Sequence, residues 1–341
     1  MIDVNKYDFD LPAELIADKP AVPRDHSRLL VYNTRTDAIS FDYFYHLDKY
    51  LPANSFVVLN NTKVIPARIL LRKKTGGKVI TLLLVNEIEG NIIKAFADRK
   101  VVLGDKLYIN PKYFLTVIDQ DEKIFYLKFD FSKEKLIDLL IKKGRMPVPL
   151  YLRKTPLKES QLRRKYQTIF AEKDASAAAP TASLHFSQRV FSRLDEKGIK
   201  KLFITLNVGL GTFAPINITN IMEKKLHKEY FNIPEETADK IRVQKSQGRK
   251  CIAIGTTVVR TLESCKQPGI SSTDLFIFPP YEFKTVDCLI TNFHIPKSSL
   301  MLLVDAFLKF KKAKRNVIEL YKIAVRERFR FYSFGDAMLI L

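Results

Sequence analysis

The sequence predicts an α/β protein in which a small antiparallel β-barrel is inserted into a mixed-sheet α/β domain. Residues 64 to about 131 alternate in polarity with a period of two. Tight turns break this stretch at Gly76-Gly77, Glu89-Gly90 and Gly104-Asp105, which is typical of short hairpin strands. After about residue 165 strand-like runs alternate with helical ones, which is typical of a sheet covered by helices.

Six strand candidates fill the first region, enough for a small closed or nearly closed barrel. They are Ile69–Leu71, Lys78–Val85, Asn91–Ala97, Val101–Ile109, Phe114–Ile118 and Lys123–Phe131. A helix over Ser132–Lys143 follows. The segment Gly144-Arg-Met-Pro-Val-Pro149 then forms a stiff connector.

The second region predicts a helix over Thr181–Lys197 and a strand over Lys201–Val208. Two further strand-and-helix pairs are Cys251–Ile254 with Thr257–Cys265, and Val286–Thr291 with Ser298–Phe310. Strands near Arg28–Asn33 and Phe56–Leu59 are expected to join the same sheet. The predicted α/β domain is therefore discontinuous, made of residues 1–63 and 150–341, and residues 64–149 form the inserted barrel domain.

Composition narrows the class of protein. The chain has 341 residues and is 46% apolar, enough for a sizeable core and two domains. Its 57 Lys+Arg against 37 Asp+Glu give a net charge of +20. This charge indicates a polyanionic partner or, equally well, a genome rich in A and T that inflates lysine codons.

Targeting and cysteine signals are weak. The acidic N-terminus does not resemble a signal peptide, and no run approaches the roughly 18 apolar residues of a membrane span. We therefore expect a cytoplasmic protein. Cys251, Cys265 and Cys288 lack CxxC spacing, so neither a disulfide framework nor a zinc site is predicted.

Polar strings that packing does not require follow two of the predicted strands. In Ile254-Gly-Thr-Thr-Val-Val-Arg260, the hydroxyls of Thr256 and Thr257 open a helix whose free N–H groups suit a carboxylate or phosphate. Ordinary N-capping explains the same threonines. Thr291-Asn-Phe-His-Ile-Pro-Lys-Ser298 has the same layout, and the ends of neighbouring strands in an open sheet are where ligands bind.

Two histidines outside these two strings are candidate bases. His185 follows Pro180-Thr181, in the predicted first turn of a helix, where the dipole lowers its pKa and keeps the imidazole neutral. A packing or capping role is the alternative. His227 and Glu229 share one face if their segment is extended, which suits a base oriented by a carboxylate. An HxE pair also occurs in metal sites, but no third ligand is evident and no metal is predicted.

Gly209-Leu-Gly-Thr-Phe-Ala214 fits the GxGxxA dinucleotide fingerprint in form. That fingerprint needs a helix to begin at its glycines, and Pro215 and Asn217 are poor helix starters. A turn, or a close approach of backbone to a ligand, is the favoured interpretation.

Near the N-terminus, guanidinium, amide and hydroxyl groups gather beside strands in Pro23–Arg28 and in Asn60–Lys63 with Arg68. Such groups hold the edge of a heterocycle or a phosphate. Surface ion pairing among Arg24, Asp25 and Arg28 is the alternative.

Together and in this order, these strings resemble the S-adenosylmethionine:tRNA ribosyltransferase-isomerase family of queuosine biosynthesis. The resemblance spans nearly the whole chain. It rests on Phe9–Ala17, Arg24–Leu30, Leu59–Arg68, Gly144–Pro147, Tyr166–Thr168, Ala178–Phe186, Val208–Phe213, Gly255–Ser264, Asp287–Leu303 and Ser333–Ile340.

The resemblance implies transfer of the ribosyl portion of S-adenosylmethionine to 7-aminomethyl-7-deazaguanine at the wobble position of a tRNA with a GUN anticodon. Isomerisation then gives epoxyqueuosine, and adenine and methionine are released. It also implies an α/β domain with an inserted barrel. No cofactor is required, because S-adenosylmethionine is consumed as a substrate. A monomer is expected, with Lys and Arg holding the anticodon stem-loop and aromatic rings stacking a splayed base.

The chemistry requires a base, because the sulfonium acidifies the neighbouring ribose C5′–H. The candidates are His185, His227 with Glu229, and His294. The residues expected to bind substrate are Arg24, Asp25, Ser27, Arg28, Asn60, Asn61, Thr62, Lys63, Arg68, Thr181, Gly209, Gly211, Thr212, Phe213, Thr256, Thr257, Arg260, Asn292, Lys297, Ser298 and Asp336.

The chain departs from the family at three places. Asn207 stands where the family usually has His, Ala175-Ser-Ala177 replaces Gly-Ser-Val, and Ser183 replaces a Gly. Asn cannot transfer a proton near neutral pH, so a basic tRNA-binding protein without catalysis is one alternative. Another S-adenosylmethionine-dependent RNA enzyme, such as a methyltransferase, is a second. Adenine release separates the three.

Overall fold

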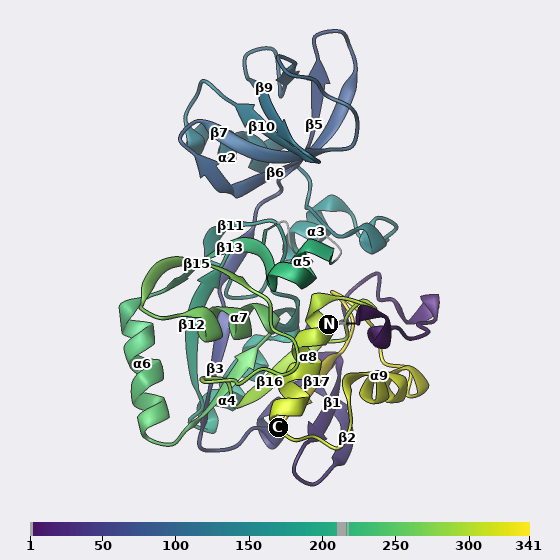
Figure 1. The fold of residues 1–341 in the computed structure, drawn as a ribbon, viewed down its shortest axis with the longest axis vertical. Coiled ribbons are helices and arrows are strands. Elements are labelled where there is room, and N and C mark those ends of the chain that lie inside the picture. Colours follow the sequence, from purple (N-terminus) through teal and green to yellow (C-terminus); the bar gives the residue numbers. More distant parts are fainter. Residues whose placement is uncertain (1–2, 210–215, 217) are drawn as a thin grey trace.

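The computed structural model describes residues 3–209, 216 and 218–341. Figure 1 shows a small barrel at one end of the molecule and a large sheet with its helices at the other. The predicted fold class, a mixed α/β domain with an inserted antiparallel barrel, is confirmed. The predicted domain limits at residues 63/64 and 149/150 stay a prediction.

The large sheet has nine strands within the described residues. Their spatial order is β15 (Gly269–Leu275), β13 (Lys225–Ile233), β12 (Lys200–Leu206), β3 (Ser55–Asn60), β14 (Lys250–Ile254), β16 (Cys288–Asn292), β17 (Ala337–Ile340), β1 (Arg28–Asn33) and β2 (Ala38–Tyr43). The central strands β12, β3, β14 and β16 are parallel. Every residue of β3 is buried, because both faces of the sheet are covered there.

Helices pack on both faces of this sheet. One face carries α6 (Glu235–Ser246), α7 (Thr256–Ser264), α8 (Ser299–Phe310) and α9 (Val317–Arg326), and the other carries α1 (Leu47–Tyr50) and α4 (Gln188–Glu196). Short 3₁₀ turns lie at η1 (Val4–Tyr7), η2 (Ala13–Leu15), η3 (Arg24–His26), η4 (Phe44–His46), η5 (Leu150–Leu152) and η6 (Thr181–His185). No helix of the described residues is long and apolar enough to cross a membrane.

The barrel closes in the order β10 (Ile124–Lys128), β7 (Ile92–Ala97), β6 (Lys78–Glu89), β5 (Arg68–Lys73), β8 (Lys106–Tyr108) and β9 (Phe114–Asp121). Its interior is filled by alternate aliphatic residues such as Leu71, Leu83 and Leu115. The helix α2 (Lys133–Lys143) begins as predicted at Ser132, whose hydroxyl accepts from the Lys135 N–H at 3.2 Å. A two-stranded sheet of β4 (Thr62–Val64) and β11 (Lys173–Ser176), together with α3 (Glu159–Lys165), lies between the two bodies, and α5 covers Ile218–Glu223.

Two predicted elements are wrong in extent. The strand expected over Val101–Ile109 is limited to β8, because Gly104 turns the chain with φ +84°. The helix expected over Thr181–Lys197 is divided into η6 and α4. Ser187 lies between them with an extended backbone and accepts from the Val190 N–H at 3.3 Å, so it begins a new helix.

The carboxyl ends of the four parallel strands meet at one edge of the sheet, here called the carboxyl edge. It follows Asn60 of β3, Leu206 of β12, Ile254 of β14 and Asn292 of β16. Asn292 pairs with Ala337 of β17, and Ala337 pairs in turn with Leu29 of β1. Segments from both ends of the chain therefore reach the carboxyl edge.

Candidate active site

His185 lies at the carboxyl edge, buried beneath the ring of Phe44 with 5.1 Å between ring centroids. Its Nε2 accepts from the side-chain amide of Asn292 at 3.2 Å. Burial, together with the positive charges of Arg330 and Arg24, lowers the pKa of His185 to about 3. The imidazole is therefore neutral, as predicted. The predicted cause is wrong, because His185 is the last residue of η6 and not in a first helical turn.

Asn292 also donates to the backbone carbonyl of Asp336 at 3.4 Å. Its Oδ1 is buried and has no hydrogen-bond partner within the described residues. The Asp336 carboxylate accepts from the backbone N–H of Arg28 at 3.0 Å and from the backbone and guanidinium of Arg330. Asp336 therefore holds the C-terminal string in place as a buried, fully paired anion.

His294 follows β16 and is also buried. Its Nε2 lies 3.2 Å from Thr291 Oγ1, and its Nδ1 lies 3.0 Å from the hydroxyl of Tyr321. Burial lowers the pKa of His294 to about 3. Both ring nitrogens have protein partners, so this imidazole braces the loop after β16.

The helix α7 begins at the same edge. Gly255 adopts φ +95°, a conformation that favours glycine, and a Cβ added there would lie 3.5 Å from the Cβ of Ala182 in η6. Thr256 is buried. The hydroxyls of Thr257 and Ser183 have no partner within the described residues. Ala182 thus brings η6 close to the start of α7, where unpartnered hydroxyls flank free helical N–H groups.

Glu229 and Arg260 form a buried ion pair, and the Glu229 Oε1 also accepts from the Gly209 N–H at 3.0 Å. Arg260 Nε donates to the carbonyl of Leu275 at 3.1 Å, whereas its Nη2 has no partner in the described chain. The predicted pairing of Glu229 with a half-buried His227 is not what the structure shows, because Arg260 and Gly209 occupy the carboxylate. The sequence spacing could not reveal this, since the ion pair joins residues 31 positions apart.

The N-terminal candidates have mostly structural partners. The buried carboxylate of Asp25 accepts two bonds from the Arg189 guanidinium, at 3.0 and 2.9 Å, and so does not pair with Arg24 or Arg28. Arg24 donates to the carbonyl of Gln167 at 2.9 Å. The Arg28 guanidinium lies 4.0 Å from the Phe329 ring centroid, whereas the hydroxyl of Ser27 is buried without a partner among the described residues.

The Asn60–Lys63 string joins β3 to β12. The Asn60 side chain donates to the Leu206 carbonyl at 3.0 Å and accepts from the Leu206 and Thr62 N–H groups, so it is a structural cross-link. Asn61 accepts from Thr205 and donates to Glu172. Lys63 lies in β4 opposite Asp174 of β11.

The remaining candidates form structural hydrogen bonds or ion pairs, or lie at the start of helices. Arg68 donates to the Val148 carbonyl at 3.1 Å and so ties the first barrel strand to the connector. Lys297 forms an ion pair with Asp8 at 2.7 Å, and Ser298 caps α8. Thr181 begins η6. Gly211, Thr212 and Phe213 lie outside the described residues.

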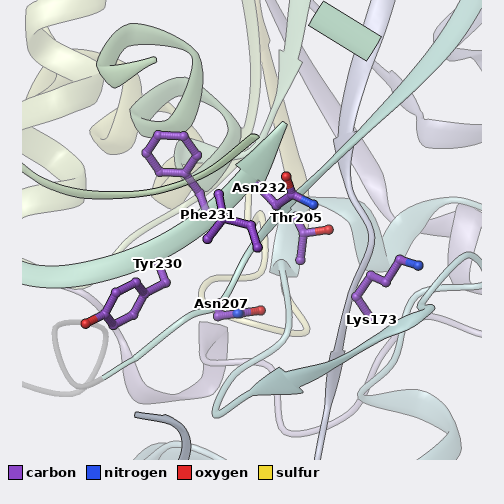
Figure 2. A pocket seen from close by; sticks show the side chains of 7 residues that line it. Lys173, Thr205, Asn207, Tyr230, Phe231 and Asn232 are labelled. Atoms are coloured by element: carbon purple, nitrogen blue, oxygen red, sulfur yellow. The ribbon is translucent and has the colours of Figure 1, made fainter. Parts of the chain in front are cut away.

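A cavity of about 190 Å³ opens beside Asn207, on the face of β12 and β13 shown in Figure 2. Its lining also includes Lys173, Thr205, Tyr230, Phe231, Asn232 and Ile270. Apart from Asn207, sequence reasoning missed these residues. Sequence reasoning also missed Arg330, Arg189 and Tyr321. Arg330 lies next to the C-terminal string, so a motif search could have found it. Within the described chain, no three His, Cys, Asp or Glu side chains are grouped to hold a metal ion.

The fold and the carboxyl edge define a class of protein: a mixed α/β domain with an inserted barrel, in which loops from distant segments gather buried neutral histidines and unpartnered polar atoms. The chain belongs to the queuosine biosynthesis protein family, whose model matches residues 4–340. It is 41% identical over 347 residues to the S-adenosylmethionine:tRNA ribosyltransferase-isomerase of Thermotoga maritima, with 99% of each chain covered. The enzyme of that name from Aquifex aeolicus is 42% identical, also over 99% of each chain.

A solved structure extends the likeness to three dimensions. The crystal structure of the S-adenosylmethionine tRNA ribosyltransferase from Thermotoga maritima matches with a TM-score of 0.54 and 33% identity, over 98% of this chain and 100% of that one. The resemblance and the enzyme class predicted from the sequence, a transferase of this family, are thereby confirmed.

Proposed function

We propose that this protein transfers the ribosyl moiety of S-adenosylmethionine to 7-aminomethyl-7-deazaguanine at the wobble position of a tRNA with a GUN anticodon. Isomerisation gives epoxyqueuosine-tRNA, with release of adenine and methionine. The observation that carries the proposal is the full-length match to relatives that bear this enzyme name. No metal or redox cofactor enters it, because S-adenosylmethionine is itself consumed. A cytoplasmic monomer remains the expected form.

The carboxyl edge supports a substrate site. Four buried polar atoms there have no partner among the described residues: Ser183 Oγ, Thr257 Oγ1, Arg260 Nη2 and Asn292 Oδ1. Leaving such an atom unsatisfied costs about 1–3 kcal/mol, so a polar ligand that satisfies several of them gains affinity. The hydroxyls and amino-acid group of S-adenosylmethionine supply matching donors and acceptors. A carboxylate also suits the N-terminus of α7 beside Gly255.

The two buried histidines act in this proposal as neutral hydrogen-bonding groups. With a pKa of about 3, protonating His185 at pH 7 costs roughly 5 kcal/mol, which makes it a weak base before substrate binds. His185 instead fixes the orientation of the Asn292 amide, whose Oδ1 has no partner among the described residues. His227, half-buried on β13, remains the candidate for removing the ribose C5′ proton.

The test is to incubate the protein with S-adenosylmethionine and tRNA that carries the precursor base. Adenine and methionine are followed by chromatography and the modified nucleoside by mass spectrometry. We expect both small products in amounts equal to the new nucleoside. His185→Gln should lower the rate, whereas the control variant Tyr126→Ala, on strand β10 of the barrel, should not.

Asn207 favours one alternative, a tRNA-binding protein without catalysis, because it stands where the family usually has His. Tight tRNA binding with neither adenine nor methionine released would establish that alternative.

A further inference from the structure

Asn207 lies outside the group of unpartnered atoms described above. Leu206 packs into the core with α7, and the next side chain along the strand points to the opposite face. There Asn207 accepts from the Thr62 hydroxyl at 3.2 Å, and its Nδ2 donates to no described residue. The amide therefore presents free N–H groups to the cavity drawn in Figure 2.

The cavity combines an aromatic ring with polar side chains. Tyr230 is half-buried, and the ammonium of the exposed Lys228 lies 5.7 Å from its ring centroid. Asn232 makes no side-chain hydrogen bond to any described residue, so a second amide is available. Lys173 stands on the other side of the cavity with its side chain 59% exposed, although it also pairs with Glu172.

The size of the cavity limits what it holds. About 190 Å³ is smaller than the roughly 300–1,000 Å³ of pockets that enclose whole small molecules. It is too small to enclose S-adenosylmethionine and suits one planar ring system attached to a chain that continues outside. Lysines on both sides and a net charge of +20 favour a chain of negative charge.

We propose that this cavity binds one unpaired base of the tRNA. The proposal rests on the proposed function for the identity of the RNA. Tyr230 contacts the base face, Asn207 and Asn232 bond to its edge, and Lys173 and Lys228 contact the flanking phosphates. Single-stranded RNA is recognised in this way, by stacking on aromatic rings and by hydrogen bonds to base edges. Asn207 then selects the base and takes no part in proton transfer.

The variants are Tyr230→Ala, Asn207→Ala and Lys228→Ala. The matched control is Tyr126→Ala on the barrel, where Lys94 lies 5.8 Å from the ring in the same arrangement. The affinity for tRNA bearing the precursor base is measured by filter binding without S-adenosylmethionine, at low and high salt. The KM for S-adenosylmethionine is measured separately.

We expect Tyr230→Ala to weaken tRNA binding roughly 5- to 100-fold at both salt concentrations, because stacking is not screened. Lys228→Ala should lose most of its effect at high salt. Tyr126→Ala should bind as the unaltered protein does. The KM for S-adenosylmethionine should not change in Asn207→Ala.

Unchanged tRNA affinity in Tyr230→Ala, or an equal loss in Tyr126→Ala, would overturn the proposal. A higher KM for S-adenosylmethionine with unchanged tRNA affinity would assign the cavity to that substrate instead. If the unaltered protein releases no adenine but the cavity variants still lose tRNA affinity, the proposed reaction fails and the binding site stands.

Discussion

Lowering the pH from 7 to 5 should destabilise this protein through two buried histidines. His185 and His294 have pKa values of about 3 in the folded chain, against 6.5 when exposed. Between these values the unfolded chain binds protons that the folded chain does not, so stability is lost as the pH falls below 6.5. The free energy of unfolding therefore falls as the pH falls, because burial keeps both imidazoles neutral in the folded chain.

The size of the effect follows from the same values. At pH 5 the pH lies 1.5 units below the pKa of a histidine in the unfolded chain. Each buried histidine therefore lowers the free energy of unfolding by about 2 kcal/mol between pH 7 and pH 5. The pair together costs about 4 kcal/mol, a large part of the roughly 5–15 kcal/mol that stabilises a typical domain. Paired carboxylates such as Asp105, whose pKa the Lys73 ammonium lowers, contribute only at lower pH.

Urea unfolding followed by circular dichroism at pH 7, 6 and 5 measures this loss. His294→Gln should lose only about 2 kcal/mol over the same interval, since one buried imidazole remains. Imidazole NMR resonances for His185 and His294 should not shift between pH 7 and 5. A folded-state titration near pH 6.5 for either ring would refute the reasoning.

Three further predictions concern the Glu229–Arg260 ion pair, Gly144 of the connector and the net positive charge of the chain. Glu229→Ala should cost about 3–5 kcal/mol in urea unfolding at pH 7, because it leaves the Arg260 charge buried alone; a loss below 1 kcal/mol would contradict this. Gly144→Ala should lower the melting temperature far more than Gly77→Ala, since an added Cβ would lie 1.7 Å from the Pro66 carbonyl oxygen; equal melting temperatures would show that this contact yields freely. The tRNA dissociation constant should rise at least about tenfold between 50 and 200 mM salt, and a flat dependence would exclude phosphate contacts as the role of the +20 charge.

The local pattern of apolar and polar residues was enough to predict many of the strands. The barrel strands alternate with period two, so each of the six was found near its place in the chain. The strands Arg28–Asn33 and Cys251–Ile254 are apolar runs that also stand out in the sequence. The edge strand β2 was missed, although Ile39, Phe41 and Tyr43 alternate with Ser40 and Asp42 in the sequence. The strands β13, β15 and β17 were not named either.

The strings that form the carboxyl edge were also visible in the sequence, because they mix His, Asn, Thr and Gly where packing needs none of them. Their partners were not visible. Asp25 bonds Arg189 across 164 positions and His185 meets Asn292 across 107. A short segment records its own period and its caps, but it carries no record of which distant segment will lie beside it.

The sequence by itself therefore determined the fold class, the family and the loops that form the edge. Only the tertiary structure decided that Glu229 pairs with Arg260, that Asn207 faces a separate cavity, and that burial lowers the pKa of both edge histidines. The reason is physical. The pKa of a side chain and the satisfaction of its hydrogen bonds depend on burial and on neighbouring charges, and both arise only when remote segments close around it.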